Sequence, residues 1–182
     1  MKSLTLIGAA LVAALSLGFA ADSRADSRQK IDENVASTLK EFRQLNSANE
    51  SLMSKAAGVL VFPRVTKAGV GVAGEYGEGV LRVNGKTVDY YSIGAASLGL
   101  TLGVAKHSEI IMFMTQDSLN KFTRSDGWSV GADAGITVMQ ASANGEYDSK
   151  TQQKPILGFI FSEKGLLGDL SLEGAKITKL AR

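Results

Sequence analysis

The sequence predicts an α+β fold in which N-terminal helices pack on a strongly curved or barrel-like, mainly antiparallel, glycine-rich β-sheet. A helical repeat of apolar residues runs from Asp26 to Lys55, and after Gly58 the pattern changes to short β-rich runs. Asn84-Gly85 separates two of these runs, which is the strongest short-range signal for a β-hairpin. Small residues alternate with apolar ones in several runs, and small side chains allow tight curvature or close approach of another backbone.

Two helices are expected, at about 27–44 and 48–56. Apolar residues of the first recur every three or four positions, as on one face of a helix: Ile31, Val35, Leu39, Phe42 and Leu45. For the second helix, Asn46 or Ser47 can begin it, Glu50 follows Ser47 at the spacing of a capping box, and Gly58 can end the segment.

The strands are expected as short, separate runs. "GVLVF" should end at Pro63, and "SLGLTLGVA" and "EIIMFMT" should be joined by a polar turn at "AKHSE". Further strands are expected in "SVGADAGITVM", "ILGFIFS" and "LLGDLSLEGAKITKL". "TQDSLNKFTRSD" interrupts them, and Thr115 or Asp117 can cap a short helix there that carries Leu119 and Phe122.

The N-terminal segment has the layout of a secretory signal peptide. Lys2 precedes an uncharged apolar run, and small residues allow cleavage after Ala20 or Ala25. The run is shorter than the roughly 20 residues that a membrane-spanning helix needs. We therefore expect a signal peptide at 1–25, a single domain at 26–182, and a periplasmic protein that is free or peripheral to a membrane. The chain has no cysteine, which excludes disulfides and a lipidated cysteine.

Gly69, Gly71 and Gly74 have the spacing G-x-G-x-x-G of a dinucleotide-binding turn. Such a turn needs a helix that begins at the last glycine, so that free N–H groups meet the pyrophosphate. Gly77 and Gly79 follow instead, and the Asn84-Gly85 hairpin leaves no room for a crossover helix. We therefore interpret the glycines as sheet geometry and expect no nucleotide and no cofactor.

Residues for catalysis or metal binding are scarce. The single histidine, His107, is expected in a solvent-facing turn, where its neighbours Ser108 and Glu109 would not converge as a catalytic triad. Four other acidic residues lack the dense spacing of a calcium loop: Asp126, Asp133, Glu146 and Asp148. The sequence therefore predicts a protein that is not an enzyme and has no structural metal. Its nearly balanced charge also argues against a nucleic-acid partner.

Four blocks of the chain resemble the SYLF domain, a lipid-binding family of bacteria and eukaryotes. They are "KAAGVLVFPRVTKAGVGVAGEYGEGVL", "YYSIGAASLGLTLGVAKHSEIIMFMTQDSLNKF", "VGADAGI" and "FSEKGLLGDLSLEGAKI", and they extend from about Lys55 to Lys179. The resemblance implies binding of anionic phospholipid head groups, which are phosphoinositides in eukaryotic members, without catalytic activity. The actin regulation of fungal relatives depends on extra segments that we do not expect to apply here.

Candidate lipid contacts are cations near predicted turns or helix ends and one aromatic residue: Arg64, Lys67, Lys106, Lys121, Arg124 and Trp128. A lysine or arginine near an anionic bilayer contributes about 1 kcal/mol, so clustered cations would give weak, salt-sensitive docking. Trp128, Phe122, Leu166 and Leu167 are candidates for insertion, although Trp128 has the alternative of a core position.

The expected function is that of a phospholipid-binding protein of the bacterial envelope that engages anionic head groups or a membrane surface. The alternative is a periplasmic protein-interaction or stress-related structural module, with a protein partner in the envelope.

Overall fold

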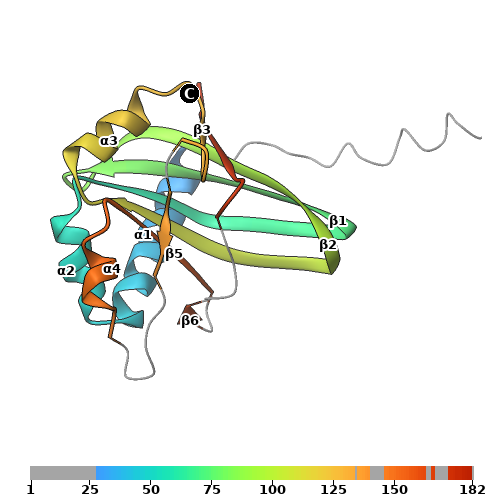
Figure 1. Cartoon of the computed structure of the whole chain (residues 1–182), viewed down its shortest axis with the longest axis horizontal. Coiled ribbons are helices and arrows are strands. Elements are labelled where there is room, and N and C mark those ends of the chain that lie inside the picture. The colour runs from blue at the N-terminus through green and yellow to red at the C-terminus, as the bar shows by residue number, and fades with distance from the viewer. Residues whose placement is uncertain (1–27, 134, 140–145, 163–164, 167–171, 182) are drawn as a thin grey trace, which may run out of the picture.

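The computed structural model describes residues 28–133, 135–139, 146–162, 165–166 and 172–181, and the predicted signal peptide lies outside them. In chain order the elements are α1 (Arg28–Leu45), α2 (Ala48–Lys55), β1 (Gly58–Val83), β2 (Lys86–Phe113), α3 (Gln116–Thr123), β3 (Trp128–Ser129), β4 (Thr137–Val138), α4 (Ser149–Gln152), β5 (Ile156–Ser162), β6 (Gly165–Leu166) and β7 (Lys176–Lys179). The α+β class is confirmed, with helices beside a strongly curled sheet (Figure 1).

Helices α1 and α2 lie where the apolar repeat predicts them. Ile31, Val35, Leu39 and Phe42 of α1 are all buried, and the Phe42 ring packs against Phe159 and Phe161 of β5, because the apolar stripe needs a partner. At the start of α2, the backbone N–H of Ala48 donates to Asn46 Oδ1 at 2.9 Å, whereas the Ser47 side chain makes no capping bond.

Strands β1 and β2 form one long antiparallel ribbon. Asn84 and Gly85 connect them with φ values of 51° and 75°, as the predicted hairpin requires. Two predicted interruptions of these strands, at Pro63 and at "AKHSE", are not found. Pro63 does not end a strand: it lies at a register shift between Phe62 and Val65, where its missing N–H costs no ladder hydrogen bond. The segment "AKHSE" is not a turn either, because β2 continues through it.

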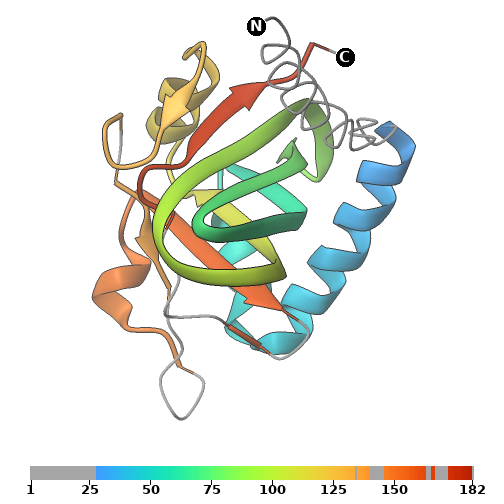
Figure 2. The ribbon, with the colours of Figure 1, turned by 90° about the vertical axis from the view of Figure 1, so that its right-hand side faces the viewer.

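The ribbon bends sharply at a second register shift, between Val70 and Val72, and folds back over its own face (Figures 1 and 2). Gly77 and Gly79 make this possible. A Cβ at Gly77 would lie 3.0 Å from the carbonyl oxygen of Arg64, and one at Gly79 would lie 2.0 Å from that of Val61. Gly74 pairs with Ala96 inside the antiparallel ribbon and begins no helix. The interpretation of the glycines as sheet geometry is confirmed.

The remaining strands extend the ribbon into a seven-stranded, mainly antiparallel sheet. Strand β5 pairs with the end of β2 near Phe113, and β7 pairs with its outer part near Ile93. Strand β3 pairs with β7 and β6 pairs with β5, both antiparallel. Strand β4 pairs with β5 in parallel. Buried residues form two clusters, one inside the curl and one beneath α1.

The short helix α3 has the predicted cap, because Thr115 accepts a hydrogen bond from the backbone N–H of Ser118. Leu119 and Phe122 are buried, so Phe122 is not available for the membrane insertion that was one of its expected roles. Among its described residues, the run "SVGADAGITVM" contributes only the second residue of β3 and the two residues of β4, and α4 was not predicted. Among the described helices, none has the length and apolar character needed to cross a membrane.

Candidate functional site

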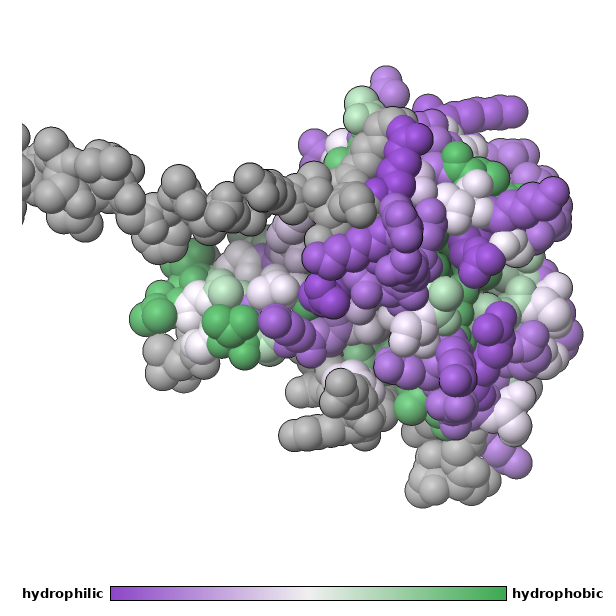
Figure 3. Space-filling view, turned by 180° about the vertical axis from the view of Figure 1, so that it is seen from behind, coloured by the Kyte–Doolittle hydropathy of each residue, from purple (hydrophilic) through white to green (hydrophobic). Residues whose placement is uncertain are grey.

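The most distinctive surface feature is the place where the ribbon folds back, which we call the ribbon bend and define by Ala68–Gly74 and Ala96–Val104. Three valines there are largely exposed: Val70 at 78%, Val72 at 59% and Val104 at 69%. In the space-filling view, apolar side chains gather at this projecting end of the molecule (Figure 3). Large apolar side chains clustered at a protruding edge are typical of a surface that meets a membrane or another protein.

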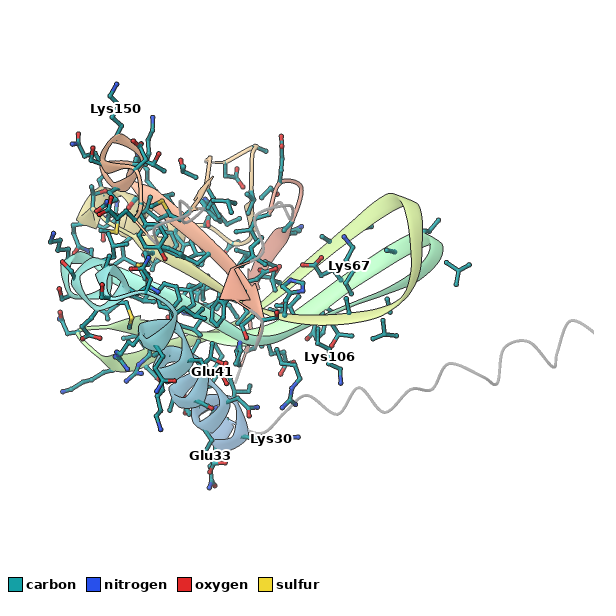
Figure 4. The ribbon with its side chains drawn as sticks, turned by 90° about the horizontal axis from the view of Figure 1, so that it is seen from below. Lys30, Glu33, Glu41, Lys67, Lys106 and Lys150 are labelled. Atoms are coloured by element: carbon teal, nitrogen blue, oxygen red, sulfur yellow. The ribbon has the colours of Figure 1, made fainter. Side chains whose placement is uncertain are left out.

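Two of the predicted cations flank the ribbon bend. Lys67 pairs with Ala105 and Thr66 pairs with Lys106, so the two lysines stand at the same level of the ribbon. Because successive residues of a strand point to opposite faces, Lys67 and Lys106 lie on opposite sides, as Figure 4 shows. Both sides of the bend therefore carry a positive charge just behind the apolar end.

Arg64 and Lys106 also line a groove of about 620 Å³ between α1 and the ribbon. Polar residues of α1 form its other wall: Asn34, Ser37, Thr38 and Glu41. Arg64 is exposed and lies at the register shift next to Pro63, which turns it out of the regular ladder. The groove brings together two of the predicted cations, opposite one carboxylate.

The other candidates lie elsewhere. Lys121 lies in α3 and Arg124 is the C-cap of that helix, at the end of the molecule away from the ribbon bend (Figure 1). Lys121 forms an ion pair of 2.9 Å with Asp117. The five predicted cations therefore do not form one surface. Trp128 is only 3% exposed and packs against Phe113 and Phe122. It therefore occupies the core, which was the alternative expected for it, and is not available for insertion into a membrane. Leu167 lies outside the described residues.

His107 is buried, which corrects its predicted place in a solvent-facing turn. It lies within β2, and Nε2 is 2.8 Å from Glu109 Oε1 and 3.5 Å from Glu75 Oε1. His107 and Glu109 share a face of β2, and Glu75 reaches them from the folded-back part of β1. We call these three residues the buried cluster.

The buried cluster changes the ionisation of its members. Burial opposes protonation of His107, but hydrogen bonds and charges from Glu109 and Glu75 outweigh it and raise its pKa to about 9. Burial raises the pKa of Glu109 to about 7. For Glu75, burial is the largest single effect and opposes ionisation, but the hydrogen bonds to His107 and Glu109 and the charges of His107 and Lys67 together outweigh it, and the pKa is lowered. His107 and Glu109 therefore hold protons to a higher pH than free His and Glu side chains would, whereas Glu75 stays ionised to a lower pH.

Sequence reasoning missed both the apolar end and the buried cluster. The alternation of valine and glycine in "GVGVAG" was the signal for the first, but exposure of those valines depends on the fold-back. For the second, His107 and Glu109 have the two-residue spacing of neighbours on one strand face, a signal lost when "AKHSE" was interpreted as a turn.

Residues 94–181 match the family model described as Ysc84, Las17-binding protein actin regulator. Comparison with curated protein sequences returns no match. The matched segment covers most of β2 and the elements that follow it, and the preceding "KAAGVLVFPRVTKAGVGVAGEYGEGVL" block forms the other strand of the same ribbon. Residues 94–181 of this chain therefore belong to the SYLF domain family.

Proposed function

We propose that this chain is a non-enzymatic phospholipid-binding protein of the bacterial envelope, exported to the periplasm, that docks on anionic bilayer surfaces through the ribbon bend. The observation that carries the proposal is the exposed apolar end, with Val70, Val72 and Val104 in front of Lys67 and Lys106. Exposing three valines to water is unfavourable for the protein, whereas burying them at the boundary between lipid head groups and acyl chains is favourable.

The dimensions of the ribbon suit this role. Val70 is three residues beyond Lys67, and strands rise about 3.3 Å per residue, so the valine lies roughly 10 Å beyond the lysine along the strand. Interfacial segments bury their apolar faces about 5–10 Å into the bilayer boundary. With the bend inserted, Lys67 and Lys106 would lie at the level of the phosphates.

The energetics favour reversible binding. Full burial of a valine is worth about 1.5 kcal/mol or more, and each lysine near an anionic surface about 1 kcal/mol. Part of this free energy is lost to the ordering of protein and lipid. We therefore expect weak, salt-sensitive docking, in which the groove beside Lys106 offers Arg64 as a further phosphate contact.

The alternative is that the same surface binds a protein partner, as a periplasmic interaction or stress-related structural module. The description of the matched family model, which names a protein-binding actin regulator, favours this second function. An apolar bend flanked by lysines would also fit an acidic protein surface.

Vesicle co-sedimentation tests the proposal. Purified chain is mixed with phosphatidylglycerol vesicles or with phosphatidylcholine vesicles, at low and at high salt. Pelleting that requires the anionic lipid and falls as salt rises supports lipid docking. Equal recovery in the supernatant with both lipids at low salt contradicts it and favours the protein-binding alternative.

A further inference from the structure

The buried cluster has a donor set that neither the family nor the proposed lipid surface accounts for. One imidazole nitrogen and two carboxylate oxygens, from His107, Glu75 and Glu109, all lie within 4.8 Å of one another. These residues come from two parts of the ribbon that are brought together by its fold-back. Within the described ranges of the chain, His107 and Glu109 are the ionisable side chains among the buried polar residues, so their convergence needs a physical reason.

The spacing of the donors matches a transition-metal site. Ligands of a tetrahedral zinc ion at bonds of about 2.0–2.1 Å lie roughly 3.3 Å apart. The two measured separations from His107 Nε2, 2.8 Å to Glu109 and 3.5 Å to Glu75, bracket that value. Small side-chain movements would place all three donors around one ion.

Glu109 supplies an independent observation. Its residue is 1% exposed, and in the part of the chain that the structure describes its Oε2 atom has no hydrogen-bond partner. A buried carboxylate oxygen without a partner is costly, and a hydrogen bond from His107 satisfies only the other oxygen. A metal ion that binds both oxygens of the Glu109 carboxylate would satisfy Oε2 and would neutralise the buried negative charge.

We propose that Glu75, His107 and Glu109 bind one divalent transition-metal ion, with zinc fitting the donor set best. An imidazole ligand favours zinc and its neighbours over magnesium and calcium, which prefer oxygen alone. Three protein ligands leave a coordination position for water, and the half-buried Glu75 marks the side from which the ion enters. Because the ligands join the two halves of the folded ribbon, the ion would clamp the bend in place.

Isothermal titration of the untagged, chelator-treated chain with zinc chloride alone tests the site. We expect one ion per chain, and at least a hundredfold weaker binding in both Glu75→Gln and His107→Gln. Glu41→Gln, an exposed carboxylate on α1, is the matched control and should bind zinc as the parent does. Calcium chloride should give no saturable binding.

Cobalt(II) provides a second readout that does not depend on affinity. Cobalt bound at three protein ligands and water should give the intense visible absorption of a four-coordinate ion, and zinc should displace it. Circular dichroism identifies any variant that fails to fold. Glu75 is less buried than His107, so Glu75→Gln keeps the test valid if His107→Gln does not fold. Absence of stoichiometric zinc binding to the parent, or unchanged binding in folded Glu75→Gln, would overturn the proposal.

Discussion

Gly79 lies directly against the backbone carbonyl of Val61, where the ribbon folds over its own face. A Cβ at position 79 would lie 2.0 Å from that oxygen and 2.7 Å from the Phe62 ring, closer than any real contact. The neighbouring oxygen belongs to the backbone, so it cannot rotate away as a side chain could. The curl of the sheet therefore depends on the absence of a side chain here.

Gly79→Ala should destabilise the fold by about 3 kcal/mol, at the upper end of the cost of overpacking a core. Gly74→Ala is the matched control, because no atom lies within 4 Å of a Cβ there, and it should be neutral or slightly stabilising. Urea unfolding followed by the fluorescence of the single tryptophan measures both. Equal stability of the two variants would show that the ribbon does not fold back as described.

Tyr147 hydrogen-bonds to the buried side-chain amide of Asn49, between the helices and the sheet. Its hydroxyl donates to Asn49 Oδ1 at 2.7 Å, and Asn49 Nδ2 donates to the carbonyl of Phe42 at 2.6 Å. Tyr147→Phe removes the donor to a fully buried oxygen and should cost about 1–3 kcal/mol in the free energy of unfolding. Tyr76→Phe, which loses an exposed hydroxyl, should change it by less than about 0.5 kcal/mol. A similar small effect at both positions would contradict the burial of Asn49.

The buried cluster predicts how the stability of the metal-free chain depends on pH. The pKa of Glu109 is raised from 4.5 to about 7 and that of His107 from 6.5 to about 9, so the folded state binds more protons than the unfolded state across this range. Their joint contribution is therefore fully present below pH 4.5, the ordinary pKa of Glu109, and is lost as pH rises to about 9. The lowered pKa of Glu75, which Lys67 also faces, acts oppositely below its ordinary value of 4.5.

Urea unfolding in the presence of a chelator should thus show a free energy of unfolding that falls between pH 5 and 9. His107 alone accounts for a loss on the order of 3 kcal/mol between pH 6.5 and 9, from the size of its shift. His107→Gln should flatten that part of the profile. A stability that rises over the same interval would contradict the hydrogen bonding of the cluster.

Much of the fold could be predicted because its signals are local. The apolar stripe of α1, the Asn84-Gly85 turn and the Thr115 cap each depend on a few neighbouring residues, and all three are confirmed. The breaks at Pro63 and "AKHSE" were predicted wrongly, because a proline or a polar run normally marks a turn. Here a register shift accommodates the proline, and the second half of the polar run, from His107 to Glu109, is buried within β2.

The candidate site could be predicted less well, because it depends on contacts between distant residues. Of the five candidate cations, three lie on the ribbon, whereas Lys121 lies in α3 and Arg124 caps the end of that helix. Whether Lys67 and Lys106 share a face is decided by the register of β1 against β2, which no short segment encodes. Burial of His107 likewise follows only once the ribbon folds back.

Lys67→Gln with Lys106→Gln should weaken binding to phosphatidylglycerol vesicles about thirtyfold, since two lysines contribute about 2 kcal/mol in total. The double variant should also show a smaller salt dependence than the parent. Lys121→Gln with Lys150→Gln, exposed lysines on α3 and α4, is the matched control and should bind nearly as the parent does. Equal weakening by both pairs would mean that net charge, and not the ribbon bend, governs binding.

Insertion of the ribbon bend is tested most directly by single-cysteine labelling, because the chain has no cysteine of its own. Val104→Cys places an environment-sensitive fluorophore on the bend, and Val88→Cys, at another exposed valine, serves as control. With phosphatidylglycerol vesicles, the account predicts a blue shift and quenching by spin-labelled lipid at position 104 and neither at 88. An unchanged spectrum at 104 in chain that co-sediments with the vesicles, or equal changes at both positions, would contradict it.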